Sequence, residues 1–238
     1  MMTDRPGFLF SSATVGRGVF QIELGLPSVS LIEEDDFEFR TTSLTALARY
    51  GVSDDLELRL GAPVYTEVRV EFDRFDDSES GYGDLEVGLK WHLIDGEGAR
   101  PDFALIPSVI VPTGEDGFSV EDPVYQLNAA LEWSLAGGWG LMGLGGVLSG
   151  EEGDGGRFYQ ETAALNLWRT LPSSPDWSVF GELAFITTDL GDGAESVFLG
   201  GGVEYLVSND LQLDAFFDRG LTDESPDWLF GLGLSARF

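Results

Sequence analysis

The chain has 238 residues, carries a formal net charge of −29 and contains no cysteine. The excess of acidic side chains excludes a nucleic-acid partner, because a phosphate backbone is bound by a basic surface. The lack of cysteine excludes disulfides and thiolate metal sites, and no apolar run reaches the roughly 18 residues that a membrane-spanning helix requires.

Apolar and polar side chains alternate at a period of two along most of the chain, which is typical of β-strands with one apolar and one polar face. The clearest segment is 56–72, in which Leu58 and Leu60 alternate with Glu57 and Arg59. Most segments have about 10 to 14 residues, a length that suits tilted strands crossing a bilayer. In chain order, the predicted strands are 18–31, 37–50, 56–72, 85–93, 102–113, 125–135, 139–149, 158–170, 177–187, 196–207, 211–218 and 228–238. In 139–149 and 158–170 the apolar residues change from one set of alternate positions to the other, so a β-bulge in these segments is an open alternative.

The connections between these segments alternate between short turns and longer acidic loops. The short turns are 51–54, 136–138, 172–175 and 208–210, with a longer exception at 95–101; the acidic loops are 32–36, 73–80, 113–124, 149–157, 187–195 and 220–227. Outer-membrane barrels have short periplasmic turns and longer outer loops. We therefore predict an all-β fold, a single antiparallel up-and-down transmembrane β-barrel of about twelve strands over residues 17–238. It would lie in a bacterial outer membrane, after removal of a signal peptide, with both termini on the periplasmic side.

Aromatic residues gather near the predicted membrane edges, as amphipathic rings do in barrels. This predicted aromatic belt consists of Trp91, Trp133, Trp139, Trp168, Trp177, Tyr205 and Phe238 at the periplasmic edge, and Trp228 at the opposite edge. The belt predicts contact with outer-membrane lipid.

The polar face of the strands predicts a charged lumen. Its candidate lining residues are Glu23, Arg49, Glu57, Arg59, Glu67, Arg69, Glu86, Lys90, His92, Glu132, Glu182, Glu204, Asp214, Asp218 and Arg237. Acids outnumber bases, which favours a cation-preferring aqueous path; a lumen closed by salt bridges is the alternative. The N-terminal segment 1–16, with Phe8, Leu9 and Phe10, either enters the lumen as a plug or forms a periplasmic tail.

No catalytic site, metal site or cofactor is predicted. His92 is the only histidine, and the chain has no Gly-x-Ser-x-Gly motif for a nucleophile. Gly138–Gly143 fits a dinucleotide-binding spacing, but it lacks the strand before it and the helix after it. The acidic runs 73–79 and 151–154 leave open Ca²⁺ binding, or bridging to lipopolysaccharide through divalent ions. Solvated loops are the commoner outcome for such runs.

Several short motifs, in order, resemble one known family. They are Thr3–Pro6, Arg49–Gly51, Asp55–Arg59, Gly83–Lys90, Pro112–Gly114, Pro226–Trp228 and Arg237–Phe238. Together they resemble the outer-membrane barrel family named for the meta pathway of phenol degradation, whose members are labelled transporters. The resemblance implies an outer-membrane barrel that passes small, aromatic or hydrophobic solutes. Phe238 also resembles the C-terminal signal that the barrel-assembly machinery reads.

Two functions follow as hypotheses. The first is a passive channel or transporter for small solutes, with lumen charges shaping its selectivity. The second is a non-conducting structural or adhesion barrel that acts through its acidic outer loops.

Overall fold

The computed structural model of the chain describes residues 1–34, 36–151, 155–190 and 193–238. Over these residues the secondary structure is almost wholly β, with one turn of 3-10 helix, η1 (Ala136–Gly138). No helix in this part of the chain is long and apolar enough to span a membrane. The strands are β1 (Phe20–Glu34), β2 (Phe37–Gly51), β3 (Leu56–Phe72), β4 (Phe75–Gly81), β5 (Leu85–Ile94), β6 (Asp102–Val111), β7 (Val124–Ser134), β8 (Trp139–Glu151), β9 (Arg157–Leu171), β10 (Ser174–Thr188), β11 (Ala194–Ser208), β12 (Leu211–Gly220) and β13 (Trp228–Arg237).

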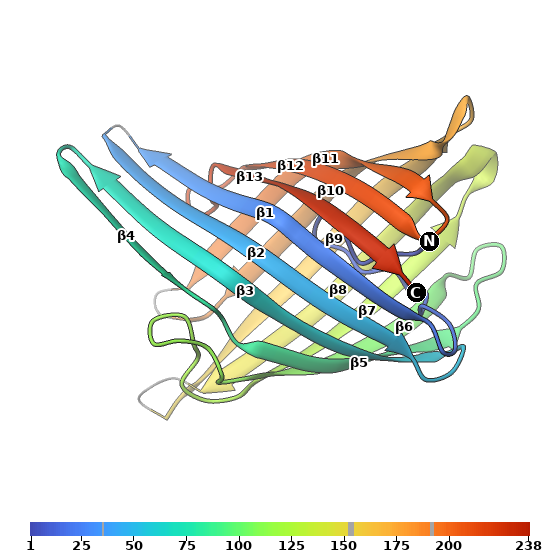
Figure 1. Cartoon of the computed structure of the whole chain (residues 1–238), viewed down its shortest axis with the longest axis horizontal. Helices are drawn as coiled ribbons and strands as arrows, with labels where there is room; N and C mark the ends of the chain where they lie inside the picture. The colour runs from blue at the N-terminus through green and yellow to red at the C-terminus, as the bar shows by residue number, and fades with distance from the viewer. Residues whose placement is uncertain (35, 152–154, 191–192) are drawn as a thin grey trace.

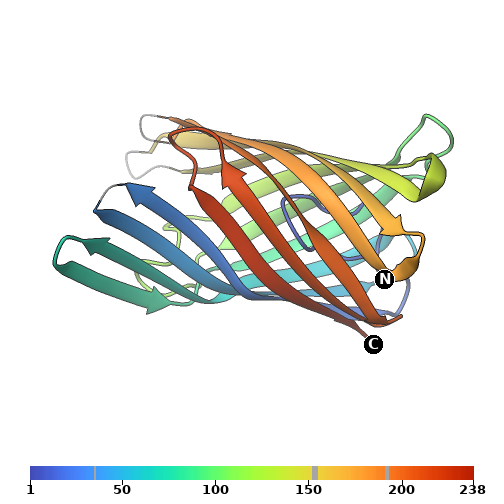
Figure 2. The same ribbon diagram turned by 90° about the horizontal axis from the view of Figure 1, so that it is seen from above.

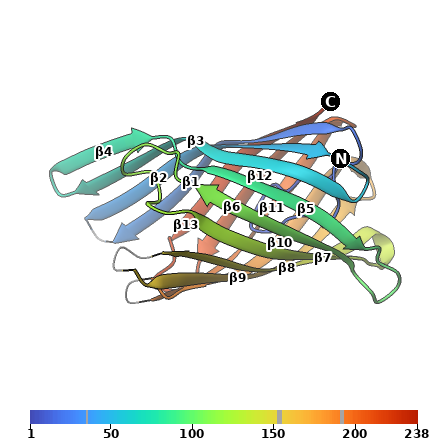
Figure 3. The same ribbon diagram turned by 90° about the horizontal axis from the view of Figure 1, so that it is seen from below.

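The strands form a closed antiparallel barrel in which neighbours along the chain are neighbours in the sheet (Figures 1 and 3). β1 pairs with β2 and with β13, so the last strand closes on the first. One edge of β3 pairs with β2, and its other edge pairs first with β5 and then with β4. Because β4 only prolongs the position of β5, the closed barrel has twelve strands. The predicted all-β, up-and-down barrel is confirmed.

The acidic segment 73–80 is where the predicted organisation is wrong. We expected a loop there, but β4 pairs with β3 from Phe72↔Phe75 to Thr66↔Gly81 around a tight turn, in which Asp73 has a φ of 51°. The hairpin reaches past the rest of the barrel (Figures 1 and 2). Its residues 75–80 are exposed. A hairpin beyond the barrel needs no apolar face, so the period-two signal is missing from its sequence.

Of the two segments for which a bulge was left open, β8 and β9 pair with each other without a register shift, and only the pairing of β9 with β10 shifts, at its end. Shifts that reverse a face occur in β1 and β3. β8 and β9 pair without interruption from Trp139↔Arg169 to Glu151↔Arg157. In β1, by contrast, the pairing with both neighbours shifts around Pro27. In β3 it shifts at Val64. Each shift inserts one extra residue and reverses the face of the residues that follow.

The outer surface of the barrel is apolar and its inner surface is polar. In β3, Leu58 and Leu60 are 48% and 46% exposed, whereas Glu57 and Arg59, which alternate with them, are 0% and 7% exposed. Charged residues are almost never buried so completely unless they are paired. This arrangement suits contact of the outer surface with lipid.

The two ends of the chain lie at the same end of the barrel (Figure 1). Phe20 and Phe238 are joined by two backbone hydrogen bonds, of 3.2 and 2.7 Å, which complete the pairing of β1 with β13. Residues 1–16 precede β1 and run back inside the ring of strands (Figure 2). We call these residues the inner segment.

Candidate functional site

The inner segment contributes apolar side chains to the core of the barrel. Leu9 is 3% exposed and packs in one cluster with Ile106 of β6 and Phe198 of β11. Phe8 stacks on Phe198 with ring centroids 5.1 Å apart. Full burial of a side chain of this size contributes about 1.5–3 kcal/mol. The apolar run that begins at Phe8 therefore holds the segment inside the barrel.

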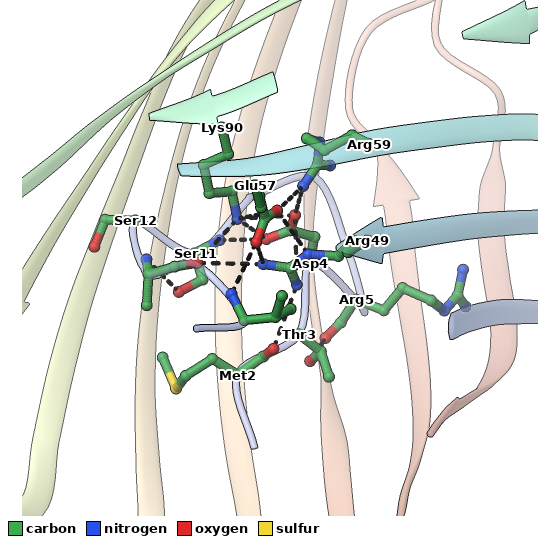
Figure 4. A network of polar contacts seen from close by, with 12 residues as sticks. Met2, Thr3, Asp4, Arg5, Ser11, Ser12, Arg49, Glu57, Arg59 and Lys90 are labelled. Carbon is green, nitrogen blue, oxygen red and sulfur yellow. Dashed lines mark hydrogen bonds and ion pairs between the residues drawn. The ribbon is translucent and has the colours of Figure 1, made fainter. Parts of the chain in front are cut away.

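Asp4 of the inner segment lies at the centre of a buried ionic cluster (Figure 4). Its carboxylate accepts hydrogen bonds from Lys90 Nζ, at 2.7 and 2.9 Å, and from Arg59 Nη1. Arg49 Nη1 lies 3.7 Å from Asp4 Oδ2. The side chains of Asp4, Arg49 and Lys90 have no exposed surface. Such charges are tolerated away from water only when opposite charges and hydrogen bonds surround them.

Two carboxylates of the wall complete the cluster. Glu57 accepts hydrogen bonds from Arg49 Nε and Nη2 at 2.8 and 3.0 Å. Glu23 accepts one from Arg49 Nη1 at 2.7 Å. The wall thus supplies Glu23 and Glu57 against three cations, and Asp4 makes the cluster neutral. The inner segment is therefore part of the charge balance of β1, β2, β3 and β5.

Wall side chains also bind the backbone and hydroxyl groups of the inner segment. Val15 N–H donates to Glu57 Oε2 at 2.9 Å. The Ser12 hydroxyl donates to Glu132 Oε2 at 3.2 Å. His92 Nδ1 donates to the carbonyl oxygen of Ser12 at 3.0 Å. The segment is thus fixed by contacts along its length, from β3, β5 and β7.

The wall formed by β10, β11 and β12 carries carboxylates with few cations. Glu182 Oε2 accepts a hydrogen bond from Phe8 N–H at 3.1 Å, and Arg5 Nη2 lies 3.5 Å from Asp214 Oδ1. Over the described residues, Arg5 is the one cationic group within 4.0 Å of any of the four carboxylates on this wall. Those four are Glu182, Glu204, Asp214 and Asp218. We call them the acidic wall.

Two of the predicted lumen residues lie on the other face of the sheet. Arg59 pairs with Arg49, which is buried in the lumen, whereas Arg69 pairs with Arg40. Arg40 and Arg49 are nine positions apart on β2. Alternation therefore puts them on opposite faces. The extra residue Val64 thus turns Arg69 outward, and the prediction of a lumen position for it is wrong.

Glu67 shares this outward face with Arg69, so its predicted lumen position is also wrong. Arg69 donates to both carboxylate oxygens of Asp76, at 3.0 and 2.6 Å, and Glu71 lies 2.8 Å from its Nε. These contacts lie on the protruding hairpin of β3 and β4. These contacts connect the two strands of the hairpin. The lumen therefore lacks the charges of Glu67 and Arg69, which counting alternate positions had placed there.

The other predicted lumen residues share the inward face of their strands. Arg237 Nη2 lies 2.8 Å from Asp210 Oδ1 near the short turn between β11 and β12. Glu86 borders a cavity beside Phe118. Buried residues of the set are Glu23, Arg49, Glu57, Arg59, Lys90, Glu132, Glu182, Asp214 and Asp218, and half-buried ones are Glu86, His92, Glu204 and Arg237.

Trp168 lies inside the barrel and is the exception in the predicted aromatic belt. Its ring covers Gly140 of β8, where a Cβ would lie 2.2 Å from the indole. It borders a cavity together with Asn166 and Thr170, which share its face of β9. The prediction of a membrane-edge position failed because it used the height of Trp168 along the strand and not its parity.

The other belt residues lie on the outer face of the barrel. Trp177 stacks on Tyr205 with centroids 4.7 Å apart, and Trp228 lies 4.1 Å from the Arg219 guanidinium carbon. Trp133 Nε1 donates to the carbonyl oxygen of Ala99 at 3.1 Å. The remaining outward members are Trp91, Trp139 and Phe238, all of them exposed.

Asp84, between β4 and β5, is a functional candidate that counting charges on the strands missed. Its carboxylate accepts hydrogen bonds from the N–H groups of Thr113, Gly114 and Val120 and from the Ser119 hydroxyl, at 2.7 to 2.8 Å. Burial alone would raise the pKa of Asp84, but these hydrogen bonds lower it below its usual value. Asp84 therefore holds the loop between β6 and β7 against the barrel. Its place within the motif Gly83–Lys90 was the available sequence signal.

Cavities lie on either side of the inner segment. One of about 180 Å³ is bordered by Met142, Trp168, Phe180 and Leu206, toward the short turns. Another of about 470 Å³ is bordered by residues including Phe118, toward the long loops. Arg5 borders both cavities. The segment therefore separates spaces that reach toward opposite ends of the barrel.

Two predictions fall partly outside the described residues. The acidic run 151–154, for which Ca²⁺ binding was left open, has Glu152, Gly153 and Asp154 there. Asp35 of the predicted loop 32–36 and residues 191–192 of the predicted loop 187–195 also lie outside the described residues.

Known structures share the architecture of this chain at low sequence identity. An outer membrane channel from Pseudomonas putida F1 superposes with a TM-score of 0.72 at 16% identity, covering 98% of this chain and 99% of that one. The transport unit of the autotransporter AIDA-I from Escherichia coli gives 0.56 at 11% identity, covering 97% and 94%. The beta domain of the Bordetella autotransporter BrkA gives 0.57 at 14% identity, covering 94% and 100%. At these identities the likeness concerns the fold.

Sequence comparison adds the family. Among curated proteins, none matches the chain. The profile of one protein family does match, over residues 3–238. The match spans nearly the whole chain, including the inner segment from Thr3 and all strands of the barrel. The chain therefore belongs to the family described as "Putative MetA-pathway of phenol degradation".

Proposed function

We propose that the protein is an outer-membrane channel for small solutes in which the inner segment closes the lumen. The observation that carries this proposal is the position of residues 3–15, which bind both sides of the lumen and separate two cavities. A closed barrel with an apolar outer face and a polar interior is what passage across an outer membrane requires. The segment would have to move, in part or whole, for a solute to pass.

The cavity lining supports a small aromatic or hydrophobic solute. Met142, Trp168 and Phe180 offer apolar surface, and Asn166 and Gln212 offer hydrogen-bonding groups. Ligand sites of this kind combine apolar walls with a few polar groups that fix orientation. The description of the family, which refers to phenol degradation, points to the same class of solute.

Conductance of the purified protein in planar bilayers tests the closure. The full chain should show small, infrequent currents, and a variant lacking residues 1–16 should show a larger and steadier conductance. As a matched control, a variant with residues 76–79 of the β3–β4 hairpin replaced by a short turn should conduct like the full chain. Equal conductance with and without residues 1–16, in barrels that remain folded, would refute closure by the segment.

A structural or adhesion barrel is the second candidate function. The exposed β3–β4 hairpin favours it, because Asp76, Asp77 and Glu79 stand beyond the barrel where a partner could reach them. Such acidic groups could also bridge to lipopolysaccharide through divalent ions. Absence of both ion current and solute uptake into liposomes, with and without residues 1–16, would favour this candidate over the channel.

Assembly into the outer membrane would use the C-terminus. Phe238 is 75% exposed, and its backbone pairs with Phe20 in the closing seam between β13 and β1. We propose that the barrel-assembly machinery reads this residue before the seam closes. Replacing Phe238 with Ser should lower the amount of folded protein in outer-membrane fractions, with little effect on refolding in detergent.

A further inference from the structure

Two carboxylates of the acidic wall meet across a glycine. Glu182 of β10 and Asp218 of β12 are both paired in register with Gly200 of the intervening strand β11. A Cβ at Gly200 would lie 2.0 Å from Asp218 Oδ1, so the missing side chain leaves room for the two groups to approach. Both carboxylates therefore face the lumen on either side of the same position of β11.

Three of the four carboxylate oxygens have no hydrogen-bond partner among the described residues. Both oxygens of Asp218 and Oε1 of Glu182 are buried and unpartnered, and only Glu182 Oε2 accepts a bond, from Phe8 N–H at 3.1 Å. Glu182 is 3% exposed and Asp218 is 0% exposed. Buried polar atoms are rarely left unsatisfied, and ionised ones least of all. These oxygens therefore require a positively charged group that the described residues do not supply.

A shared proton satisfies this requirement only in part. One proton joins two of the oxygens and leaves the other without a donor, whereas a metal ion can accept several oxygens at once. Two carboxylates also match the charge of a divalent ion. Hard cations such as Ca²⁺ take oxygen ligands in irregular arrangements and keep water in the remaining positions. We propose that Glu182 and Asp218 bind one divalent cation, with Ca²⁺ as its best-fitting member.

The proposed site lies against the inner segment. A Cβ at Gly7 would lie 2.3 Å from Glu182 Oε1, and Gly7 has a φ of 84°, which favours glycine. This close approach places the backbone of the segment directly over the ligand oxygens. A cation bound there would hold Glu182 in the position in which it accepts the hydrogen bond from Phe8 N–H.

A cavity also borders the inner segment at Gly7, the residue that contacts Glu182. This cavity of about 210 Å³ is bordered by Gly7, Phe8 and Phe216. Phe216 precedes Asp218 by two positions and lies on the same face of β12. Hydroxyl groups of Ser30, Thr41 and Ser43 also border it. The site does not depend on whether a solute passes through the barrel.

Calcium binding by the full chain in detergent micelles tests the proposal. After removal of metal by a chelator, titration calorimetry in roughly 1 M KCl, where the Debye length is about 3 Å, suppresses binding to the exposed acidic loops. We expect one Ca²⁺ per chain under these conditions. Asp218→Asn and Glu182→Gln should each lower the affinity roughly 10-fold or more. Glu86→Gln is the matched control, because this lumen-facing carboxylate of β5 lies across the barrel from β10 and β12, and it should leave binding unchanged.

Infrared spectroscopy separates the cation from a shared proton. Ca²⁺ should remove part of the carbonyl absorption of protonated carboxylic acids in the metal-free protein, and this Ca²⁺-dependent loss should be absent from Asp218→Asn. A difference spectrum without such a loss at saturating Ca²⁺ would overturn the proposal, and so would equal Ca²⁺ binding by the full chain and Asp218→Asn. Heat-dependent migration in gels identifies variants that keep a folded barrel, so that loss of binding is not mistaken for loss of the fold. If Asp218→Asn fails to fold, Glu182→Gln carries the same comparison.

Discussion

The two sides of the lumen handle buried charge in different ways. On β1, β2, β3 and β5, Arg49, Arg59 and Lys90 face Glu23 and Glu57, and Asp4 balances the set. On the acidic wall, four carboxylates face one nearby cation, Arg5. Each side therefore needs opposite charge from outside the wall. The first side obtains it from Asp4 of the inner segment. The acidic wall obtains it only in part, from Arg5.

This difference indicates what holds the inner segment in place. Asp4 is bound by hydrogen bonds from two cations, whereas the contact of Arg5 with Asp214 is a single one at 3.5 Å. Coulombic attraction and hydrogen bonding both weaken with distance. We therefore expect the segment to be held most strongly at Asp4 and to separate first from the acidic wall.

Removing the Asp4 charge should have the largest effect. In Asp4→Asn the cluster would keep three cations against two carboxylates, and breaking a buried ion pair costs about 3–5 kcal/mol. The barrel can relieve this cost by releasing the segment. We expect a lower free energy of unfolding in detergent and faster chymotrypsin cleavage after Phe8 and Phe10. Asp55→Asn, at an exposed turn, is the control; matching results for the two variants would contradict the importance of the cluster.

Asp84 shows a third way of holding a buried carboxylate, by N–H and hydroxyl donors. Asp84→Ala leaves three backbone N–H groups without their acceptor, at a cost of about 1–3 kcal/mol. The expected result is faster hydrogen exchange at Gly114 and Val120, with the rest of the barrel unchanged. Exchange that stays slow at these amides would show that the loop is held by other contacts.

The same carboxylate gives the loop a pH dependence. The folded-state pKa of Asp84 is lowered. The ionised carboxylate therefore stabilises the folded loop above the unfolded-state pKa, and this stabilisation is lost as the pH falls through the folded-state pKa. Hydrogen exchange of the loop, corrected for the intrinsic rate, should therefore rise on acidification in the full chain. Asp84→Ala should not show this dependence, and an identical pH profile for both proteins would contradict the assignment.

Neutralising the acidic wall should affect selectivity more than stability. Glu204 and Asp214 pair in register across β11 and β12, and like charges directly opposite each other are destabilising. Glu204→Gln should therefore leave the free energy of unfolding equal or slightly higher. In the variant lacking residues 1–16, it should reduce the preference for cations, measured as the reversal potential in a salt gradient. An unchanged reversal potential would mean that this wall does not shape the ion path.

The smallest effect is expected at Arg69. If Val64 turns this side chain outward onto the hairpin, Arg69→Ala removes only exposed ion pairs with Glu71 and Asp76, and such pairs contribute little. Stability and conductance should both match those of the full chain. A change in ion selectivity would instead place Arg69 in the lumen and contradict the register of β3.

The barrel could be predicted from the sequence. Alternation at period two, strand length and the sorting of short and long connections follow from local geometry and from the different surroundings of the two faces, so they can be read without a structure. The inward positions of Glu57, Arg59 and Lys90 followed from the same counting. Alternation also predicts the inward position of Trp168, because Leu165 and Leu167, at odd positions of the same strand, face outward.

The charge partners and the reversals of face depend on the tertiary structure. Asp4 meets Arg59 and Lys90 across 55 and 86 positions of the chain, because barrel closure and strand stagger bring those strands around the inner segment. A single extra residue at Val64 reverses the faces of Glu67 and Arg69, and parity counting assumes that no such residue exists. The place of the inner segment in the lumen likewise depends on burial and pairing across the whole barrel, which local pattern does not encode.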